Sequence, residues 1–265
     1  MSVREVFASA AAEHRSALIG YLPVGFPNVA ESIAAMRTMV AAGADIVEVG
    51  VPYSDPVIDG PTIQSAVEIA LRAGTRVRDV FAAVEAIAEA GATPMVMSYW
   101  NPIERYGVAE FARALSFSGG AGLITPDLLP EEATEWIAAS DKYQLDRVFL
   151  VAPSSTQARL VSTAAACRGF VYAASVMGAT GARDQLSNAA PALARRVRAV
   201  TDLPVGVGLG VSNGKQAAQV ASYADGVIVG SALVSCLLDA SDRDSGQQAL
   251  HELVVDLAEG VRARP

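Results

Sequence analysis

The sequence is poor in the residues that bind metals or form imines with a substrate. It has only two histidines, His14 and His251, and its only lysines are Lys142 and Lys215. His14 falls in a predicted N-terminal helix and His251 in the predicted last helix, so a histidine-ligated metal is not expected at the strand ends. No predicted strand ends in lysine, which disfavours an aldolase that works through a Schiff base.

Cysteine, long apolar runs and positive charge are also scarce. Cys167 and Cys236 form no CxxC motif and are predicted to be small buried thiols. No apolar run reaches the roughly 18 uncharged residues of a membrane span, and Met1–Arg15 lacks the layout of a signal peptide, so we expect a cytoplasmic protein. A net charge of −8 offers no large basic face to nucleic acid. Neither a GxxxxGK(S/T) loop nor a strand followed by GxGxxG is present.

Short runs rich in β-branched residues alternate with longer alanine-rich stretches. A chain of 265 residues with 52% hydrophobic composition has the size and the apolar content of one α/β barrel. Eight strand–helix repeats without a linker predict a single (β/α)8 TIM barrel over residues 1–265. The predicted strands are Ala17–Tyr21, Asp45–Val49, Pro94–Ser98, Gly122–Thr125, Arg147–Val151, Phe170–Ala174, Pro204–Val207 and Gly226–Val229.

The predicted helices and the loops around them indicate which end of the barrel carries the functional site. Val3–His14 is an extra helix before the first strand, and Gln247–Val261 is the closing helix. Gly43, Gly91 and Gly169 are expected to end helices in the left-handed conformation. The opposite ends of the strands run into longer polar loops, which form the catalytic face in barrels of this kind. Helices between the strands are expected at Val29–Ala42, Val77–Glu89, Val108–Ser116, Glu131–Ala139, Thr156–Ala166, Ala189–Val200 and Gly214–Ala221.

The segment Glu48–Gln64 contains a carboxylate in an unusual place. Glu48 interrupts an apolar predicted strand, where alternation puts its side chain on one face with Ile46 and Gly50. Either that face is the barrel interior, or Glu48 pairs with an arginine or lies at a misassigned strand end. Asp59 follows in an Asp-Gly-Pro sequence that alone indicates a turn. Together the two residues predict a site with paired carboxylates for proton transfer.

Three glycine-bearing loops follow the last three predicted strands. They are Gly178–Gly181, Gly206–Gly210 and Gly230–Ser231. Glycine lets backbone N–H groups approach phosphate oxygens, and barrels often bind phosphate at this place. Each loop alone is compatible with an ordinary turn. In succession they predict a phosphate site after strands 6–8, with Ser231 as a hydroxyl donor at the start of a helix Ala232–Leu238.

These segments resemble the tryptophan synthase alpha subunit family. The matching segments occur in family order over nearly the whole chain; the first is specific, and the glycine loops are shared with other phosphate-binding barrels. Tyr21, where some members have phenylalanine, and Phe26 before Pro27 depart from the family without removing a catalytic group. The segments are Glu48–Gln64, Ser98–Pro102, Pro126–Asp127, Tyr172, Gly178–Gly181, Gly208–Gly210 and Gly230–Ser231.

The resemblance implies a role for each matching residue. The implied activity is the retro-aldol cleavage of indole-3-glycerol phosphate to indole and glyceraldehyde 3-phosphate. Glu48 would be the general acid at indole C3, and Asp59 would hold and deprotonate the indole N–H. Thr180 would position Asp59 on loop closure. The other implied substrate contacts are Tyr21, Met97 and Ile124 in the indole pocket, Tyr172 near Glu48, and Gly181, Gly210, Gly230 and Ser231 at the phosphate.

The resemblance also implies a partner. A beta subunit that carries pyridoxal phosphate would consume the indole with serine, in an alpha2beta2 assembly, while this chain would hold no cofactor. Its docking surface is expected on the catalytic face, although each candidate residue is singly compatible with an ordinary loop. The exposed candidates are Pro52, Tyr53, Asp55, Asn101, Pro102 and Tyr106.

Three other functions are compatible with parts of the sequence. Another phosphate-binding barrel, an isomerase or a synthase, conflicts with the full motif Glu48–Gln64. A catalytically silent regulatory subunit conflicts with an intact pair of Glu48 and Asp59. A stand-alone lyase that releases indole would keep the same site, so this alternative stays open.

Overall fold

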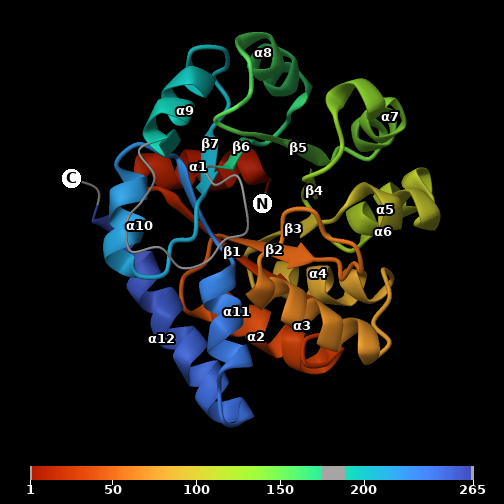
Figure 1. Cartoon of the computed structure of the whole chain (residues 1–265), viewed down its shortest axis with the longest axis vertical. Coiled ribbons are helices and arrows are strands. Elements are labelled where there is room, and N and C mark those ends of the chain that lie inside the picture. Colours follow the sequence, from red (N-terminus) through yellow and green to blue (C-terminus); the bar gives the residue numbers. More distant parts are fainter. Residues whose placement is uncertain (1, 175–188, 264–265) are drawn as a thin grey trace.

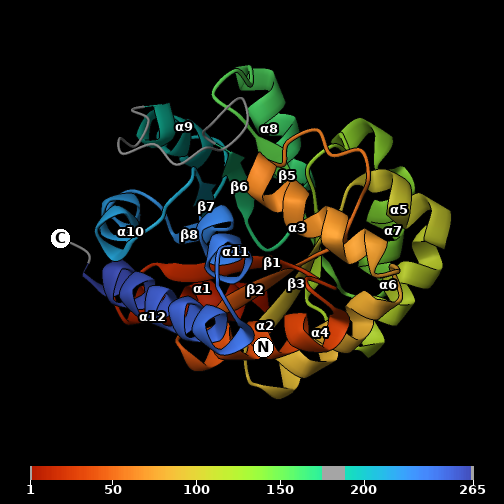
Figure 2. The same cartoon turned by 60° about the horizontal axis from the view of Figure 1, so that its bottom comes forward.

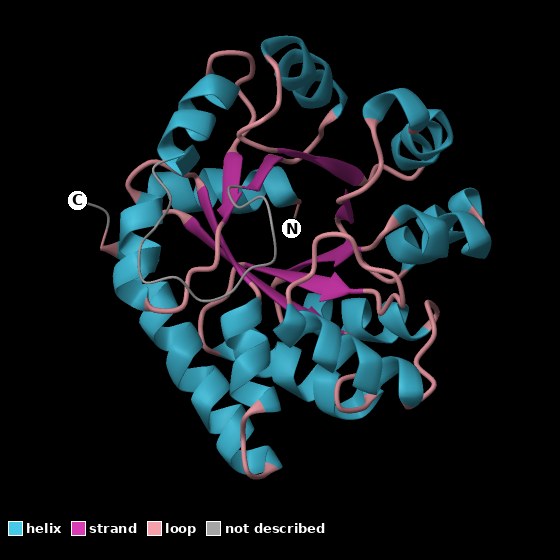
Figure 3. Cartoon of the chain, viewed as in Figure 1, coloured by secondary structure: helices cyan, strands magenta, loops and turns pink. Residues whose placement is uncertain are grey.

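Eight parallel strands close into a barrel in the order of the sequence. The computed structural model describes residues 2–174 and 189–263. Each strand pairs with its neighbours in the chain, and β8 pairs with β1 to close the barrel. The predicted (β/α)8 fold is therefore confirmed, and Figures 1 and 3 show the strands inside a ring of helices. The strands are β1 (Ala17–Pro23), β2 (Ile46–Gly50), β3 (Thr93–Met97), β4 (Gly122–Thr125), β5 (Asp146–Val151), β6 (Val171–Ala174), β7 (Val205–Gly208) and β8 (Gly226–Val229).

The helices bury apolar faces against the outside of this barrel. Gly43 and Gly91 follow the C-caps of α2 and α4 with positive φ angles of 111° and 93°, as a residue that ends a helix requires. Gly169 also has a positive φ of 90°, but α8 ends at Ala166 with Cys167 as its C-cap, so Gly169 does not end that helix as expected. Within the described ranges, no helix is both long and apolar enough to cross a membrane. The helical elements are α1 (Val3–Ala12), α2 (Val29–Ala41), α3 (Pro61–Arg72), α4 (Asp79–Glu89), α5 (Trp100–Tyr106), α6 (Val108–Phe117), the short 3-10 turn η1 (Pro130–Glu132), α7 (Thr134–Lys142), α8 (Gln157–Ala166), α9 (Ala189–Arg198), α10 (Gly214–Ala221), α11 (Ser231–Leu238) and α12 (Arg243–Arg262).

Two helices lie where the sequence analysis expected only loop. α3 begins at Pro61, with Gly60 as its N-cap, so the Asp-Gly-Pro sequence leads into a helix where a turn was expected. It packs beside α11 at the catalytic face (Figure 2). α5 begins at Trp100, directly after β3. One predicted helix was too long, because α1 ends at Ala12 and His14 lies beyond it at a φ of 56°.

The helix α1 closes the bottom of the barrel. Its buried side chains belong to the cluster that fills the barrel interior. The ring of Phe7 lies 5.6 Å from that of Phe170 on β6, measured between centroids. In the view of Figure 1, α1 crosses the barrel inside the ring of helices. The bottom of the barrel is thus filled by apolar side chains, and the opposite end carries the loops described below.

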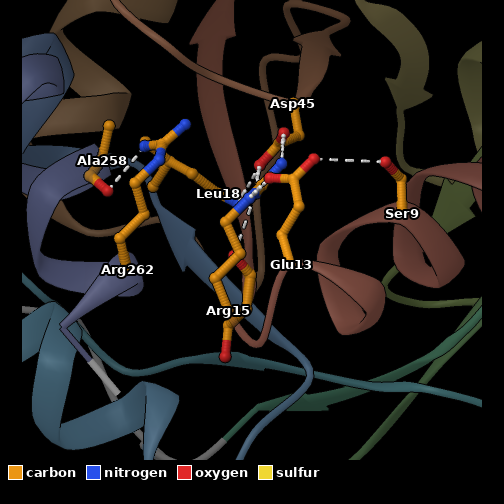
Figure 4. A network of polar contacts seen from close by, with 8 residues as sticks. Ser9, Glu13, Arg15, Leu18, Asp45, Ala258 and Arg262 are labelled. Carbon is orange, nitrogen blue, oxygen red and sulfur yellow. Dashed lines mark hydrogen bonds and ion pairs between the residues drawn. The ribbon is translucent and has the colours of Figure 1, made fainter.

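A largely buried ion pair holds the short segment between α1 and β1 against Asp45, the residue that precedes β2. The guanidinium of Arg15 donates to both carboxylate oxygens of Asp45, at 2.7 and 2.8 Å, and to Glu13 at 2.6 Å. The Leu18 N–H also donates to Asp45 at 2.8 Å, and Figure 4 shows Arg15 between the carboxylates of Asp45 and Glu13. The exposed fractions of Arg15 and Asp45 are 8% and 16%, so solvent screens their attraction only weakly.

We expect Arg15→Ala to lower the free energy of unfolding by about 3 kcal/mol, because it leaves the Asp45 carboxylate buried without its cation. Urea unfolding followed by circular dichroism measures this loss. Arg37→Ala is the control, since the Arg37–Glu89 pair is 52% and 65% exposed. Its removal should cost less than about 1 kcal/mol. Equal losses in the two variants would show that the Arg15 pair contributes no more than a surface pair.

Candidate active site

A cavity of about 140 Å³ opens at the carboxyl ends of the strands. Side chains from β1, β2, β3, β5, β6 and β8 form its floor, while α3 and the loops after β2, β7 and β8 form its rim. Within the described part of the chain it is lined by Tyr21, Glu48, Ile58, Asp59, Ile63, Met97, Leu150, Tyr172, Ala174, Gly208, Leu209, Gly210, Ile228, Gly230 and Ser231.

Glu48 stands inside the barrel, as strand alternation predicted. It lies at the centre of β2 and is only 1% exposed. Neither carboxylate oxygen has a hydrogen-bond partner among the residues that the structure describes, so the alternative pairing with an arginine does not occur there. Burial raises the pKa of Glu48 from 4.5 to about 8. Near neutral pH this carboxyl therefore holds a proton, the state that a general acid requires.

Asp59 reaches the same cavity from the loop between β2 and α3. Burial raises its pKa above 3.8, while a hydrogen bond with the hydroxyl of Tyr99 acts in the opposite direction. The side chain of Gln64 also donates to the backbone oxygen of Asp59 at 2.7 Å, which ties the loop to the first turn of α3. Two carboxyl groups thus line one cavity in different surroundings, one fully buried and one hydrogen-bonded.

Two glycines make room for the tyrosines on either side of Glu48. A Cβ atom on Gly50 of β2 would lie 2.4 Å from the hydroxyl oxygen of Tyr21 on β1. A Cβ atom on Gly208 of β7 would lie 2.5 Å from the hydroxyl oxygen of Tyr172 on β6. Burial raises the pKa of both tyrosines, and the charge of Glu48 contributes to each shift. Both phenols are therefore neutral and lie near Glu48.

The glycine loops expected at the phosphate form one end of the cavity. Gly210 has a φ of 81°, and among the described residues a Cβ atom there would meet nothing within 4 Å, so none of them covers its backbone at the cavity. Gly230 is the N-cap of α11, which begins at Ser231, so the positive end of the helix dipole meets the cavity. Thr180 and Gly181 lie outside the described residues.

The two apolar residues implied for the indole pocket differ in position. Met97 ends β3 and lines the cavity. Ile124 on β4 is fully buried in the cluster that fills the barrel interior, and it is not among the described residues that line the cavity. Ile58, Ile63 and Leu150 supply apolar cavity wall that the sequence analysis did not name.

The residues expected to face a partner differ in exposure. Asp55 and Asn101 are exposed, and Tyr53 and Pro102 are half-buried. Pro52 was expected to be exposed and is buried, because it directly follows the buried end of β2. Tyr106 is half-buried because its ring packs edge-on against Phe81 and Phe111, with centroids 5.7 and 6.1 Å away. The sequence analysis missed Val57, a 74% exposed apolar residue on the same loop as Asp55.

Neither cysteine is among the described residues that line this cavity. Burial raises the pKa of Cys167 to about 12, which keeps the thiol protonated. Cys236 is half-buried rather than buried as predicted. Over residues 2–174 and 189–263, no three His, Cys, Asp or Glu side chains gather as a metal site would require.

The fold and the cavity are those of a (β/α)8-barrel enzyme, with two carboxyl groups, apolar side chains and the N-terminus of a helix around one cavity at the carboxyl ends of the strands. The chain belongs to the tryptophan synthase alpha chain family, whose family model matches residues 7–262. Its activity is that of the family: the lyase half-reaction of tryptophan biosynthesis, which cleaves indole-3-glycerol phosphate to indole and glyceraldehyde 3-phosphate.

Similar proteins support this assignment over the whole chain. The tryptophan synthase alpha chain of Nocardia farcinica is 65% identical over 257 residues, which cover 97% of this chain and 94% of that protein. A structure of Mycobacterium tuberculosis tryptophan synthase superposes with a TM-score of 0.93 at 61% identity, covering 98% of each chain. The alpha chain from Legionella pneumophila gives a TM-score of 0.89 at 30% identity, covering 98% of this chain and 97% of that one.

Proposed function

We propose that the chain cleaves its substrate by acid–base chemistry shared between Glu48 and Asp59. The observation that supports this most strongly is the burial of Glu48 without a hydrogen-bond partner among the described residues, which raises its pKa to about 8. A protonated carboxyl on the cavity floor can deliver a proton, and Asp59 on the rim can receive one. Because the two carboxyl groups have different surroundings, one can act as the acid and the other as the base.

The proton balance of the cleavage fits these roles. Glu48 gives its proton to indole C3, while Asp59 takes the proton of the indole N–H. Glu48, now ionised, then takes the proton of the hydroxyl on the carbon attached to C3, and the aldehyde forms as the bond from C3 to that carbon breaks. The bonding electrons return to the ring, whose nitrogen takes back the proton held by Asp59. Indole leaves, and both carboxyl groups are back in their starting protonation states. Tyr21, Met97 and Tyr172 would surround the ring, and Ile124 would support it from the barrel interior.

The phosphate would bind at the glycine-lined end of the cavity. Gly210 leaves its backbone open, and Gly230 and Ser231 offer the N-terminus of α11 to an anion. Gly181 would add a backbone amide, and Thr180 would hold Asp59 when the loops close. Binding through backbone amides fits a chain whose only lysines, Lys142 and Lys215, do not line the cavity described here.

We also propose that a beta subunit with its own pyridoxal phosphate docks over the cavity, in an alpha2beta2 assembly, and that this chain itself holds no cofactor. Asp55 and Val57 are exposed on the loop that carries Asp59, and the exposed Asn101 is hydrogen-bonded to Tyr53 of that loop. Pro52, Tyr53, Pro102 and Tyr106 are the less exposed members of the proposed surface. Indole is small and apolar, so a partner at the mouth would capture it before it escapes. Such capture requires both subunits in one compartment, which we propose is the cytoplasm.

The test is indole release from indole-3-glycerol phosphate, with and without a cognate beta subunit. We expect weak cleavage by the chain alone and a clear rise when the partner binds, because the docked loop also carries Asp59. Asp55→Ala should weaken this rise, and size-exclusion chromatography reports the complex itself. Cleavage that a beta subunit neither binds nor increases would favour the stand-alone lyase.

A further inference from the structure

The hydroxyl of Tyr99 joins the catalytic loop to the neighbouring strand. Tyr99 lies between β3 and α5 and is 5% exposed. Its hydroxyl accepts a hydrogen bond from the Ile58 N–H at 3.1 Å and shares another with the Asp59 carboxyl. A phenol has one proton to give, and because its oxygen accepts from Ile58, that proton is directed to Asp59. Tyr99 is not among the described residues that line the cavity, and its hydroxyl reaches the cavity through Asp59.

Tyr99 is fixed to the barrel more firmly than the loop that it contacts. Its backbone oxygen accepts from the hydroxyl of the buried Ser98 at 2.8 Å. The next residue, Trp100, donates its N–H to the Asp127 carboxylate at 2.9 Å, which holds the start of α5. Asp59 lies on a loop whose neighbours Val57 and Ile58 are 74% and 42% exposed. The phenol therefore provides a fixed point for a carboxylate on a solvent-exposed segment.

The same phenol connects Asp59 to the outer surface. The ring of Tyr99 lies 5.3 Å from the ring of Tyr53, measured between centroids, at an angle of 36°. The hydroxyl of Tyr53 accepts a hydrogen bond from Nδ2 of Asn101 at 3.2 Å. Asn101 is exposed in the first turn of α5. A continuous series of contacts thus connects the exposed amide of Asn101, the rings of Tyr53 and Tyr99, and the carboxyl group of Asp59.

We propose that Tyr99 is a positioning residue for the lyase reaction, whose hydroxyl holds the Asp59 carboxylate over the cavity and links it to the surface formed by Tyr53 and Asn101. The inference rests on the function proposed for Asp59. A hydrogen bond to the charged form keeps a carboxylate ionised and limits its orientations. Within the described residues, the charge of Asp59 also raises the pKa of the buried phenols of Tyr21 and Tyr172, and both phenols are uncharged.

The test is Tyr99→Phe, which removes one oxygen and keeps the ring against Tyr53. We expect kcat to fall by about 10- to 100-fold with little change in KM, because a hydrogen bond to a charged group is lost outside the substrate contacts. The low-pH limb of kcat should move to higher pH, since the pKa of Asp59 rises without this donor. Asp59 is then protonated, and unable to act as a base, over a wider acidic range.

Tyr223→Phe is the matched control. It removes another buried phenol oxygen, one without a hydrogen-bond partner in the described residues, and should leave kcat and its pH profile unchanged. The pKa of Asp59, measured by carbon-13 NMR on folded protein, provides a readout that does not depend on turnover. An unchanged carboxyl pKa in Tyr99→Phe would overturn the proposal, as would a wild-type pH profile.

A double-variant cycle separates this inference from the function on which it rests. Tyr99→Phe should cost little in an Asp59→Asn background, because the group that it positions is already gone. Additive losses would show that Tyr99 acts independently of Asp59, and the inference would fall alone. Wild-type turnover in Asp59→Asn would instead remove the proposed role of Asp59.

Discussion

Glu48→Gln should lower kcat for indole-3-glycerol phosphate cleavage by about 100- to 10,000-fold, the usual cost of losing general acid catalysis. The amide keeps the size of the side chain but has no acidic proton to deliver to C3. KM should change little, because the contacts proposed for the phosphate stay intact. Single-turnover measurement of indole release checks this result, and a folded variant with wild-type turnover would rule out Glu48 as the acid.

The same variant should be more stable than the wild type at alkaline pH. In the unfolded chain the Glu48 carboxyl ionises near its ordinary pKa of 4.5, whereas in the folded chain burial holds its pKa at about 8. Between these values the folded protein keeps a proton that the unfolded chain has lost, so wild-type stability falls as pH rises. Glutamine carries no such penalty. Urea unfolding at pH 5 and pH 9 should therefore show the advantage of the variant growing with pH, which also demonstrates that its fold is intact.

Asp59→Asn should lower kcat by about 100-fold or more, because an amide cannot take the indole N–H proton. The loss should persist when the beta subunit is added, since the partner can order the loop but cannot supply a base. Stability should change far less than activity, because Asp59 lies on a rim loop and not in the core. Indole release with and without the partner measures the first effect, and urea unfolding measures the second.

Asp55→Asn is the matched control for that loss. It makes the same chemical change four residues earlier on the same loop, at an exposed carboxylate outside the cavity lining. Measured on the chain alone, it should retain wild-type cleavage. If both variants lost activity equally, the cause would be a general effect of charge on the loop, and Asp59 would have no specific role as base.

Much of the fold and part of the site could be predicted from the sequence. Apolar runs that alternate with amphipathic stretches leave few solutions other than a covered parallel barrel, and glycine after a helix marks where the chain turns. Glu48 was singled out because it is a charged residue in an apolar strand. Its side chain can point only to one of the two faces of the strand, and on the inner face it lies at the cavity. The loops with Gly210 and Gly230 were identified because they follow consecutive late strands.

Other features depend on which parts of the chain become neighbours in space. Tyr99 reaches a residue 41 positions earlier because β2 and β3 lie side by side and both loops rise from the same end of the barrel. The fit of Tyr21 against Gly50, the enclosure of Pro52 and the interior position of Ile124 also arise from packing between strands. Sequence periodicity determines which face a side chain takes, but not which group meets it there.

The sequence by itself therefore predicted the barrel and the glycine-lined end of the cavity, and it marked Glu48 as a carboxylate in an apolar strand, because each follows from local alternation and backbone freedom. Only the tertiary structure decided that Glu48 has no hydrogen-bond partner in the described chain and that Asp59 meets the hydroxyl of Tyr99. Both facts depend on how completely other segments exclude water and offer donors. Burial and hydrogen-bond partners set the protonation states of the two carboxyl groups, and neither the burial nor the partners can be inferred from one segment of the sequence alone.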